Sequence, residues 1–195
     1  MDEQELMKKI EEGDEMAFAQ IVTLYKSRIV NFLYQLTSDY EKAVELAQET
    51  FMRVYFKAKR YRPIAPVSSW IYTIASNLAK TEMKKKQRMT TVSIDDEYSR
   101  ASSQIYYEDN PEDMETIKNL RKALNSLHSR YRIPLVLKDI EGFSQEEIAE
   151  MLNKPIGTIK ARISRGRAYL KKEIEKNPEN FNLLSKGEEY GDERA

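Results

Sequence analysis

The segment SQEEIAEMLNKPIGTIKARISRGR, residues 144–167, decides the fold of the C-terminal part of the chain. Ser144 followed three residues later by Glu147 is the pattern of a capping box, in which each side chain bonds the backbone N–H of the other residue. Asn153 tolerates the left-handed backbone at a helix end, and Pro155 can open the helix that follows. The segment therefore predicts two helices joined by a turn of about three residues, a helix-turn-helix.

The second helix of this segment is cationic on one side and apolar on the other. Its apolar residues recur at helical spacing and are predicted to face the core: Ile156, Ile159, Ile163, Gly166 and Leu170. A basic amphipathic helix by itself is more often an ordinary solvated face, but its position after a capped helix and a tight turn favours DNA reading. Small side chains on its exposed face would let it approach base edges in the major groove. The predicted DNA-reading residues are Thr158, Lys160, Ala161, Arg162, Ser164, Arg165 and Arg167.

The charges of the chain are segregated, although they sum to zero. Residues 51–90 contain 10 basic and 1 acidic side chain, and residues 116–172 contain 13 basic and 5 acidic. The segments before, between and after these two blocks are acidic. A polyanion responds to the field within a Debye length of about 8–10 Å. The segregation of charge is therefore a better guide to binding partners than the net charge is.

Apolar residues at steps of three and four dominate the sequence, and no alternation long enough for a sheet occurs. We therefore expect an all-α protein of two small helical domains joined by a flexible acidic linker. The first unit spans residues 1–89, the linker 90–110 and the second unit 111–176, and residues 177–195 are expected to form a disordered acidic tail. The linker follows from the loss of periodicity and the replacement of apolar residues by Asp, Glu, Ser and Tyr.

Several residues predict where helices begin and end. Gly13 is placed to end a short first helix, and Asp14 to cap the second. In the second unit, Pro111 is expected at the first helical position after Asn110. A further helix is expected over Tyr131–Ile140; because Pro134 has no N–H to donate, the regular hydrogen-bonded part of this helix is expected to start close to that residue.

The composition excludes several classes of function. The chain has no cysteine and a single histidine, His128, and it has neither a phosphate-binding glycine loop nor a spaced set of metal ligands. We therefore expect no enzymatic activity, no cofactor and no metal. The start of the chain is acidic and no run approaches 18 apolar residues, so we expect a cytoplasmic protein that does not insert into a membrane.

Two motifs of the first unit, EKAVELAQETFMRVY at 41–55 and SWIYTIASN at 69–77, together resemble region 2 of the extracytoplasmic-function (ECF) group of bacterial sigma factors. Residues 139–167 resemble region 4 of the same family. The resemblance covers about residues 10–90 and 112–172, in the order that the family has. It implies a transcription initiation factor that binds core RNA polymerase and directs it to specific promoters.

The resemblance implies that region 2 docks on the clamp coiled coil of the polymerase β′ subunit. The matching residues form a carboxylate-rich stripe on one helix: Glu41, Glu45, Gln48, Glu49 and Met52. Taken alone, an ordinary solvated acidic stripe explains this pattern about equally well. The further partners that the resemblance implies are the polymerase β subunit, promoter DNA and an anti-sigma factor.

The resemblance also implies that region 2 reads the minus-ten promoter element. The segment YFKAKRYR, residues 55–62, interleaves aromatic and basic residues, a composition suited to single-stranded DNA because rings stack on bases while cations hold phosphates. Stacking worth about 1–3 kcal/mol per base can offset an unpairing cost of a few kcal/mol, so melting could begin without ATP. By resemblance, Tyr61 and Asn77 line the pocket of a flipped base. The predicted minus-ten residues are Lys57, Arg60, Tyr61, Arg62, Asn77, Lys80, Lys84 and Lys85.

A stand-alone helix-turn-helix regulator, which binds duplex DNA without polymerase, remains the alternative. The length of the linker is consistent with the sigma-factor interpretation, in which region 4 reads the minus-thirty-five element. Two elements about 17 base pairs apart are separated by roughly 58 Å at about 3.4 Å per step. Some 20 extended residues reach about 65 Å. The linker can span this distance only if it is stretched.

Overall fold

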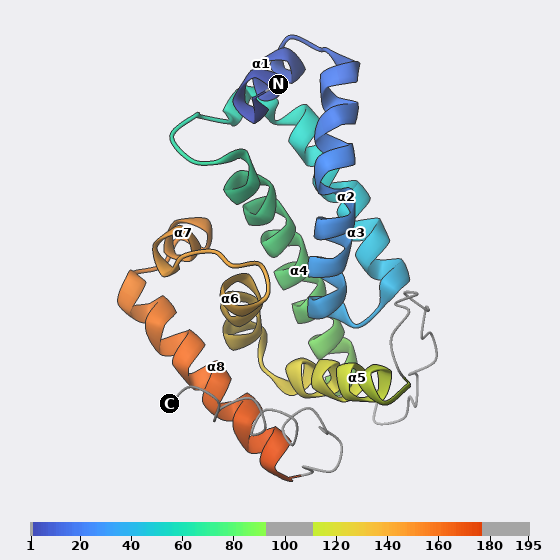
Figure 1. Ribbon diagram of the computed structural model, residues 1–195, viewed down its shortest axis with the longest axis vertical. Helices are drawn as coiled ribbons and strands as arrows, with labels where there is room; N and C mark the ends of the chain where they lie inside the picture. The colour runs from blue at the N-terminus through green and yellow to red at the C-terminus, as the bar shows by residue number, and fades with distance from the viewer. Residues whose placement is uncertain (1, 93–110, 177–195) are drawn as a thin grey trace, which may run out of the picture.

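The structure is a computed structural model that describes residues 2–92 and 111–176. Within these two ranges the secondary structure is helical (Figure 1), and the predicted all-α architecture is confirmed. The acidic tail at 177–195 and most of the predicted linker lie outside the described residues. Helix α4 continues to Val92, three residues past the point at which the sequence places the end of the first unit.

The N-terminal unit comprises α1 (Glu3–Glu11), α2 (Glu15–Thr37), α3 (Tyr40–Phe56), the 3-10 turn η1 (Ala58–Arg60) and α4 (Val67–Val92). Its helix boundaries follow the predicted signals. Gly13 has a φ of +93°, and the Asp14 carboxylate accepts hydrogen bonds from the backbone N–H groups of Met16 and Ala17 at 2.8 and 3.0 Å. Asp39 caps α3 in the same way, with the Lys42 N–H at 3.0 Å.

The core of this unit lies between α2, α3 and α4. The largest fully buried side chains of the unit are Ile21, Ile29, Phe32, Leu33 and Leu36 on α2, Ile71 and Tyr72 on α4, and Leu6 and Met7 on α1. Helix α2 supplies most of these side chains, and α3 adds Phe51 and Val54 to the core. Trp70 is only partly buried, and its ring lies 5.5 Å from that of Tyr61.

The C-terminal unit comprises α5 (Pro111–Ser126), α6 (Ser129–Asp139), α7 (Gln145–Met151) and α8 (Ile156–Lys176). Pro111 is the first residue of α5, as predicted. The helix predicted over Tyr131–Ile140 is present and begins two residues earlier, at Ser129. The expectation that its regular hydrogen bonding starts close to Pro134 is wrong, because the Arg132 N–H already bonds the His128 carbonyl at 3.1 Å. The His128 side chain caps this helix by accepting a hydrogen bond from the Arg130 N–H at 3.2 Å, so this cap and the packing around Pro134 offset the hydrogen bond that proline cannot donate.

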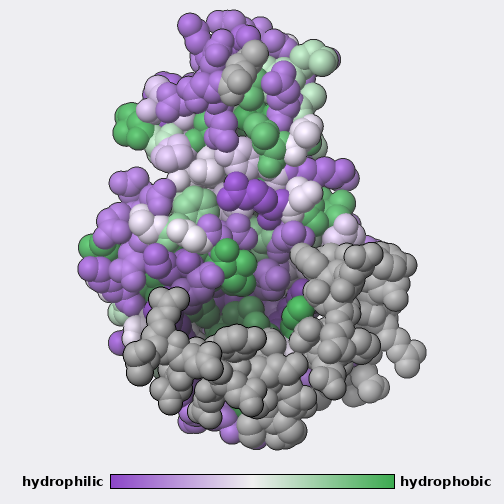
Figure 2. Space-filling view, viewed as in Figure 1, coloured by the Kyte–Doolittle hydropathy of each residue, from purple (hydrophilic) through white to green (hydrophobic). Residues whose placement is uncertain are grey.

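The two units lie in direct contact. Helix α4 lies between the α2–α3 pair and the α6–α7 pair (Figure 1), and it packs against both α6 and α7, while α2 packs against α5 and α6. Buried residues of both units form one continuous hydrophobic cluster. On the face in view, hydrophilic side chains dominate the described surface and hydrophobic ones form small separate groups (Figure 2). The sequence predicts the two units but not this association.

The capping box of α7 generates a stability prediction. Ser144→Ala leaves the Glu147 N–H without its acceptor and should lower the free energy of unfolding by about 1 kcal/mol, measured by urea denaturation. Ser27→Ala, at an exposed position inside α2, is the control and should cost no stability. A Ser144→Ala variant as stable as the unsubstituted protein would contradict the role given to this cap.

Candidate nucleic-acid interfaces

The predicted helix-turn-helix is present and its turn has the predicted geometry. The Ser144 hydroxyl accepts a hydrogen bond from the Glu147 N–H at 3.1 Å, and the Glu147 carboxylate accepts one from the Ser144 N–H at 2.8 Å. Asn153 has a φ of +48°. The carbonyl of Pro155 then accepts the N–H of Ile159 at 3.2 Å in the first turn of α8. The capping box and the turn thus fix the direction in which α8 leaves α7.

The packing of α8 decides which of its faces is exposed. Ile159 and Ile163 are 0% and 1% exposed, and an added Cβ on buried Gly166 would lie 3.5 Å from the Tyr131 carbonyl oxygen on α6. Ile156 was expected on this buried face but is exposed, because it lies at the start of the helix. Apart from this residue, the predicted inward face of α8 is confirmed, with Leu170 partly buried against the core.

The predicted DNA-reading residues lie mainly on the outward face of α8. Lys160, Ala161, Ser164 and Arg165 are exposed, whereas Thr158 and Arg162 are half-buried. Arg167 is exposed but engaged, because its Nε donates to the Asp139 carboxylate at the end of α6 at 2.9 Å. This ion pair raises the pKa of Arg167, chiefly through the hydrogen bond. Asp139 therefore partly neutralises the charge of Arg167. Arg165 is the exposed arginine of this face that can bind DNA without first breaking that ion pair.

A second basic surface lies on the N-terminal unit. Lys57, Arg60 and Arg62 are exposed around η1, and the Arg62 guanidinium donates to the carbonyl oxygens of Lys59 and Tyr61 at 2.9 and 3.0 Å. The remaining predicted residues are exposed along α4: Asn77, Lys80, Lys84 and Lys85. Asn77, Lys80 and Lys84 follow each other at spacings of three and four and so share one side of the helix.

Tyr61 occupies a different environment from the one its predicted role requires. The residue is 8% exposed, its ring packs against Trp70, and its hydroxyl donates to the Ala65 carbonyl at 2.8 Å. Burial raises the pKa of Tyr61. In this conformation the ring is covered, and Tyr61 holds the loop at residues 62–66 in place.

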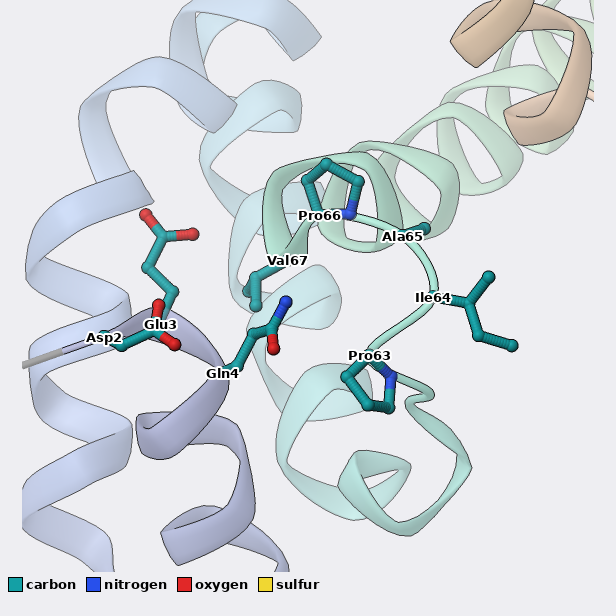
Figure 3. A pocket seen from close by; sticks show the side chains of 8 residues that line it. All are labelled: Asp2, Glu3, Gln4, Pro63, Ile64, Ala65, Pro66 and Val67. Carbon is teal, nitrogen blue, oxygen red and sulfur yellow. The ribbon is translucent and has the colours of Figure 1, made fainter.

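Two exposed apolar side chains lie beside these cations, and the sequence analysis did not select either of them. Phe56 is 76% exposed at the end of α3, and Ile64 is 93% exposed in the loop before α4. The loop borders a pocket of about 370 Å³ whose other wall is the start of α1, with Asp2, Glu3 and Gln4. Ile64 points away from these three residues (Figure 3). The signal for both was available in the sequence, since Phe56 lies within the aromatic and basic segment at residues 55–62 and Ile64 lies two residues after it.

The acidic stripe predicted on α3 is largely solvent-facing. Glu41, Glu45, Gln48 and Met52 are exposed, and Glu49 is half-buried. Two cations on the same helix reduce its negative charge, because Lys42 forms an ion pair with Glu45 and Arg53 forms one with Glu49. Met52, 56% exposed, gives the stripe an apolar end. The stripe is a mixed polar and apolar surface, which is typical of protein interfaces.

The parts of the chain that the structure describes contain no group of three side chains suited to hold a metal ion. Across the same residues, no helix has the length and apolar character needed to cross a membrane.

Comparison with known proteins identifies both units. Residues 21–89 match the family Sigma-70 region 2, and residues 117–170 match Sigma-70, region 4. The chain is 33% identical over 178 residues to the ECF RNA polymerase sigma factor SigW of Bacillus subtilis, covering 86% of this chain and 94% of that one. It is 27% identical over 181 residues to the RNA polymerase sigma-H factor of Pseudomonas aeruginosa, covering 89% and 94%.

A solved structure of similar fold is that of the sigma factor RpoE from Bartonella quintana, in complex with the anti-sigma factor NepR. It superimposes with a TM-score of 0.67 at 28% identity and covers 82% of this chain and 98% of that one. The relatives and both family matches agree with the order and content of the two helical units. The chain therefore belongs to the ECF group of RNA polymerase sigma factors, which are promoter-specific initiation factors of transcription and not stand-alone regulators.

Proposed function

We propose that this sigma factor divides promoter recognition between its two units and binds core RNA polymerase through the outward face of α3. The observation that carries the proposal is the segregation of α8, in which Ile159, Ile163 and Gly166 are buried while Lys160 and Arg165 face outward. No acidic residue occurs in α8 before Glu173. A phosphate-lined groove would therefore meet cations and the small side chains of Ala161 and Ser164 on this face.

In the proposed division, α8 enters the major groove of the minus-thirty-five element. Ala161 and Ser164 leave space for the base edges, and Arg165 is positioned to donate to a guanine. Arg167, paired with Asp139, would contact the phosphate backbone at the edge of the site. Phosphate contacts position a protein on DNA, whereas base contacts give specificity, so these two arginines would have different roles.

The N-terminal unit would hold the minus-ten element on the surface formed by η1, the 62–66 loop and α4. Lys80, Lys84 and Lys85 lie on the exposed side of α4 and suit contacts with duplex phosphates, while Lys57, Arg60 and Arg62 suit the separated strand. Asn77 is exposed and available to a flipped base. Stacking on Tyr61 would require the loop to release the Tyr61 hydroxyl from the Ala65 carbonyl, because the ring is covered at present. Such a contact would begin strand separation without ATP.

The third partner would be polymerase itself, with α3 on the clamp coiled coil of the β′ subunit and the C-terminal unit near the β subunit. Glu41, Glu45 and Gln48 offer carboxylate and amide groups, and Met52 offers an apolar anchor. An anti-sigma factor is a further proposed partner, supported by the solved complex of the related RpoE with NepR. We propose that the protein acts in the cytoplasm, where it contributes recognition and no catalysis of its own.

The polymerase surface can be tested by removing its central side chains. The double variant Gln48→Ala, Glu49→Ala should weaken binding to purified core polymerase by about tenfold, which corresponds to about 1.4 kcal/mol. The measurement is equilibrium fluorescence anisotropy of labelled protein titrated with core enzyme. The matched control removes an exposed amide and carboxylate elsewhere in the unit, Gln20→Ala with Glu11→Ala. Equal affinities for the two double variants would contradict the proposed surface.

The role of α8 predicts a change of specificity at one promoter element. Arg165→Ala should cost about 1–3 kcal/mol of discrimination at the minus-thirty-five element and leave minus-ten preference unaltered. Transcription from a promoter library randomised at both elements measures the two preferences separately. Lys172→Ala, exposed farther along α8, should leave the base preferences as they are. An unchanged minus-thirty-five profile for Arg165→Ala would remove this residue from the reading set.

A further inference from the structure

Asp139 and Arg167 form an ion pair that joins α8 to the end of α6. The Arg167 guanidinium donates to both oxygens of the Asp139 carboxylate, with its Nε 2.9 Å from Oδ2 and its Nη2 bonded to Oδ1. By contrast, Lys171 and Glu175 pair within α8 itself. Two hydrogen bonds between a planar guanidinium and a carboxylate fix the relative orientation of the two groups. The pair therefore fixes both the position and the plane of the Arg167 guanidinium.

The place of Asp139 in its helix does not favour an acidic side chain. Asp139 is the last residue of α6. The C-terminal end of a helix carries partial negative charge, which attracts cations and repels carboxylates. The stability of α6 therefore does not explain an aspartate at this position, and its interaction with Arg167 does.

The packing of α8 on α6 does not depend on this ion pair. Ile159 and Ile163 are fully buried, and Gly166 lies close to the backbone of α6. The side chains of Arg167 and Asp139 are 56% and 35% exposed, and ion pairs that water reaches contribute little to stability. The main effect of the pair is thus on where the guanidinium lies.

The backbone that carries Asp139 is held on both sides. Before it in α6, the buried Arg132 guanidinium donates to the Leu36 carbonyl of α2 at 2.6 Å. After it, the Glu141 carboxylate accepts a hydrogen bond from the Tyr72 hydroxyl of α4. A group that orients another side chain needs rigid support of this kind. Asp139 is therefore the fixed acceptor, and the long side chain of Arg167 is the group that it orients.

Arg167 lies at one end of the exposed face of α8. Lys160, Ser164 and Arg167 follow each other at spacings of four and three, so they share one side of the helix, and all three are exposed. A guanidinium has five N–H donors, and the ion pair leaves three of them free. These donors suit a phosphate that lies in the directions set by the ion pair, whereas following any other phosphate requires breaking it.

We propose that Asp139 is a positioning residue that makes α8 selective, because it orients and partly neutralises Arg167. The inference rests on the proposed function, in which α8 reads the minus-thirty-five element. An unrestrained cation binds any phosphate within reach, and such contacts carry no sequence information. Asp139 restricts Arg167 to the phosphate that it meets when α8 lies in its correct register. This restriction weakens binding to incorrect sequences more than to correct ones, and specificity is that difference.

The test uses two substitutions of Asp139 and one control. Asp139→Asn keeps the size of the side chain and removes its charge, whereas Asp139→Glu keeps the carboxylate. Glu150→Gln removes one negative charge at an exposed position on α7 and is the matched control. Asp139→Asn is also combined with Arg167→Ala, so that a double-mutant cycle isolates the effect that passes through this arginine.

The first measurement is the salt dependence of binding to a random-sequence duplex, by fluorescence anisotropy of the full chain. Asp139→Asn should bind several-fold more tightly, with a slope of log K against log salt that is steeper by about 0.9, the value for one further phosphate contact. Asp139→Glu and Glu150→Gln should keep the slope of the unsubstituted protein. Equal slopes for Asp139→Asn and Glu150→Gln would overturn the inference.

The second measurement is transcription by core polymerase with each variant on a library randomised at both promoter elements. Asp139→Asn should flatten the minus-thirty-five profile several-fold and leave the minus-ten profile unaltered. In the Arg167→Ala background, Asp139→Asn should change neither the profile nor the salt slope, because no guanidinium remains to be oriented. The same effect in both backgrounds would overturn the inference.

The library also distinguishes failure of this inference from failure of the proposed function. A minus-thirty-five preference that is present in the unsubstituted protein and survives Asp139→Asn would overturn only the role of Asp139. The absence of any minus-thirty-five preference in the unsubstituted protein would overturn the proposed function of α8, and the role of Asp139 with it.

Discussion

The packing of α8 on α6 is the constraint on which the proposed DNA recognition by this protein depends. Burial of Ile159 and Ile163, with Gly166 close to the Tyr131 backbone, leaves only one face of α8 able to meet DNA. The cations then face outward because the inward positions are occupied by apolar side chains. The capping box of α7 and the left-handed turn at Asn153 set the angle at which this face is presented. In the proposed reading of DNA by α8, specificity is thus a consequence of core packing.

Much of this structure could be predicted from the sequence because its signals are local. These signals act on backbone groups within four residues. The capping box of Ser144 and Glu147, the left-handed turn at Asn153 and the cap at Asp14 are all present as predicted. Pro134 was misleading, since the preceding cap at His128 and burial of α6 outweigh one missing hydrogen bond. Tyr61 shows the limit for the candidate site. The composition of residues 55–62 suits base stacking. The burial of Tyr61, however, depends on Trp70 and on the Ala65 carbonyl, which only the folded loop brings together.

The association of the two units could not be read from the sequence for a physical reason. Tyr72 and Glu141 are 69 residues apart, and Arg132 and Leu36 are 96 apart. The polar side chains of Tyr72, Glu141 and Arg132 are each plausible on the surface of a separate unit, and only the complementary partner makes their burial favourable. Ile64 and Phe56 present the opposite case, since both are more exposed than large apolar side chains usually are. Partners outside the chain would account for their exposure.

The central claim, that this chain gives core polymerase its promoter specificity, is tested most directly by transcription in a purified system. Core polymerase would be supplied with fragmented genomic DNA, with and without the protein, and the transcript starts would be sequenced. The account predicts initiation at a restricted set of sites that share two sequence elements and appear only when the protein is present. Initiation no better than that of core polymerase alone would contradict it.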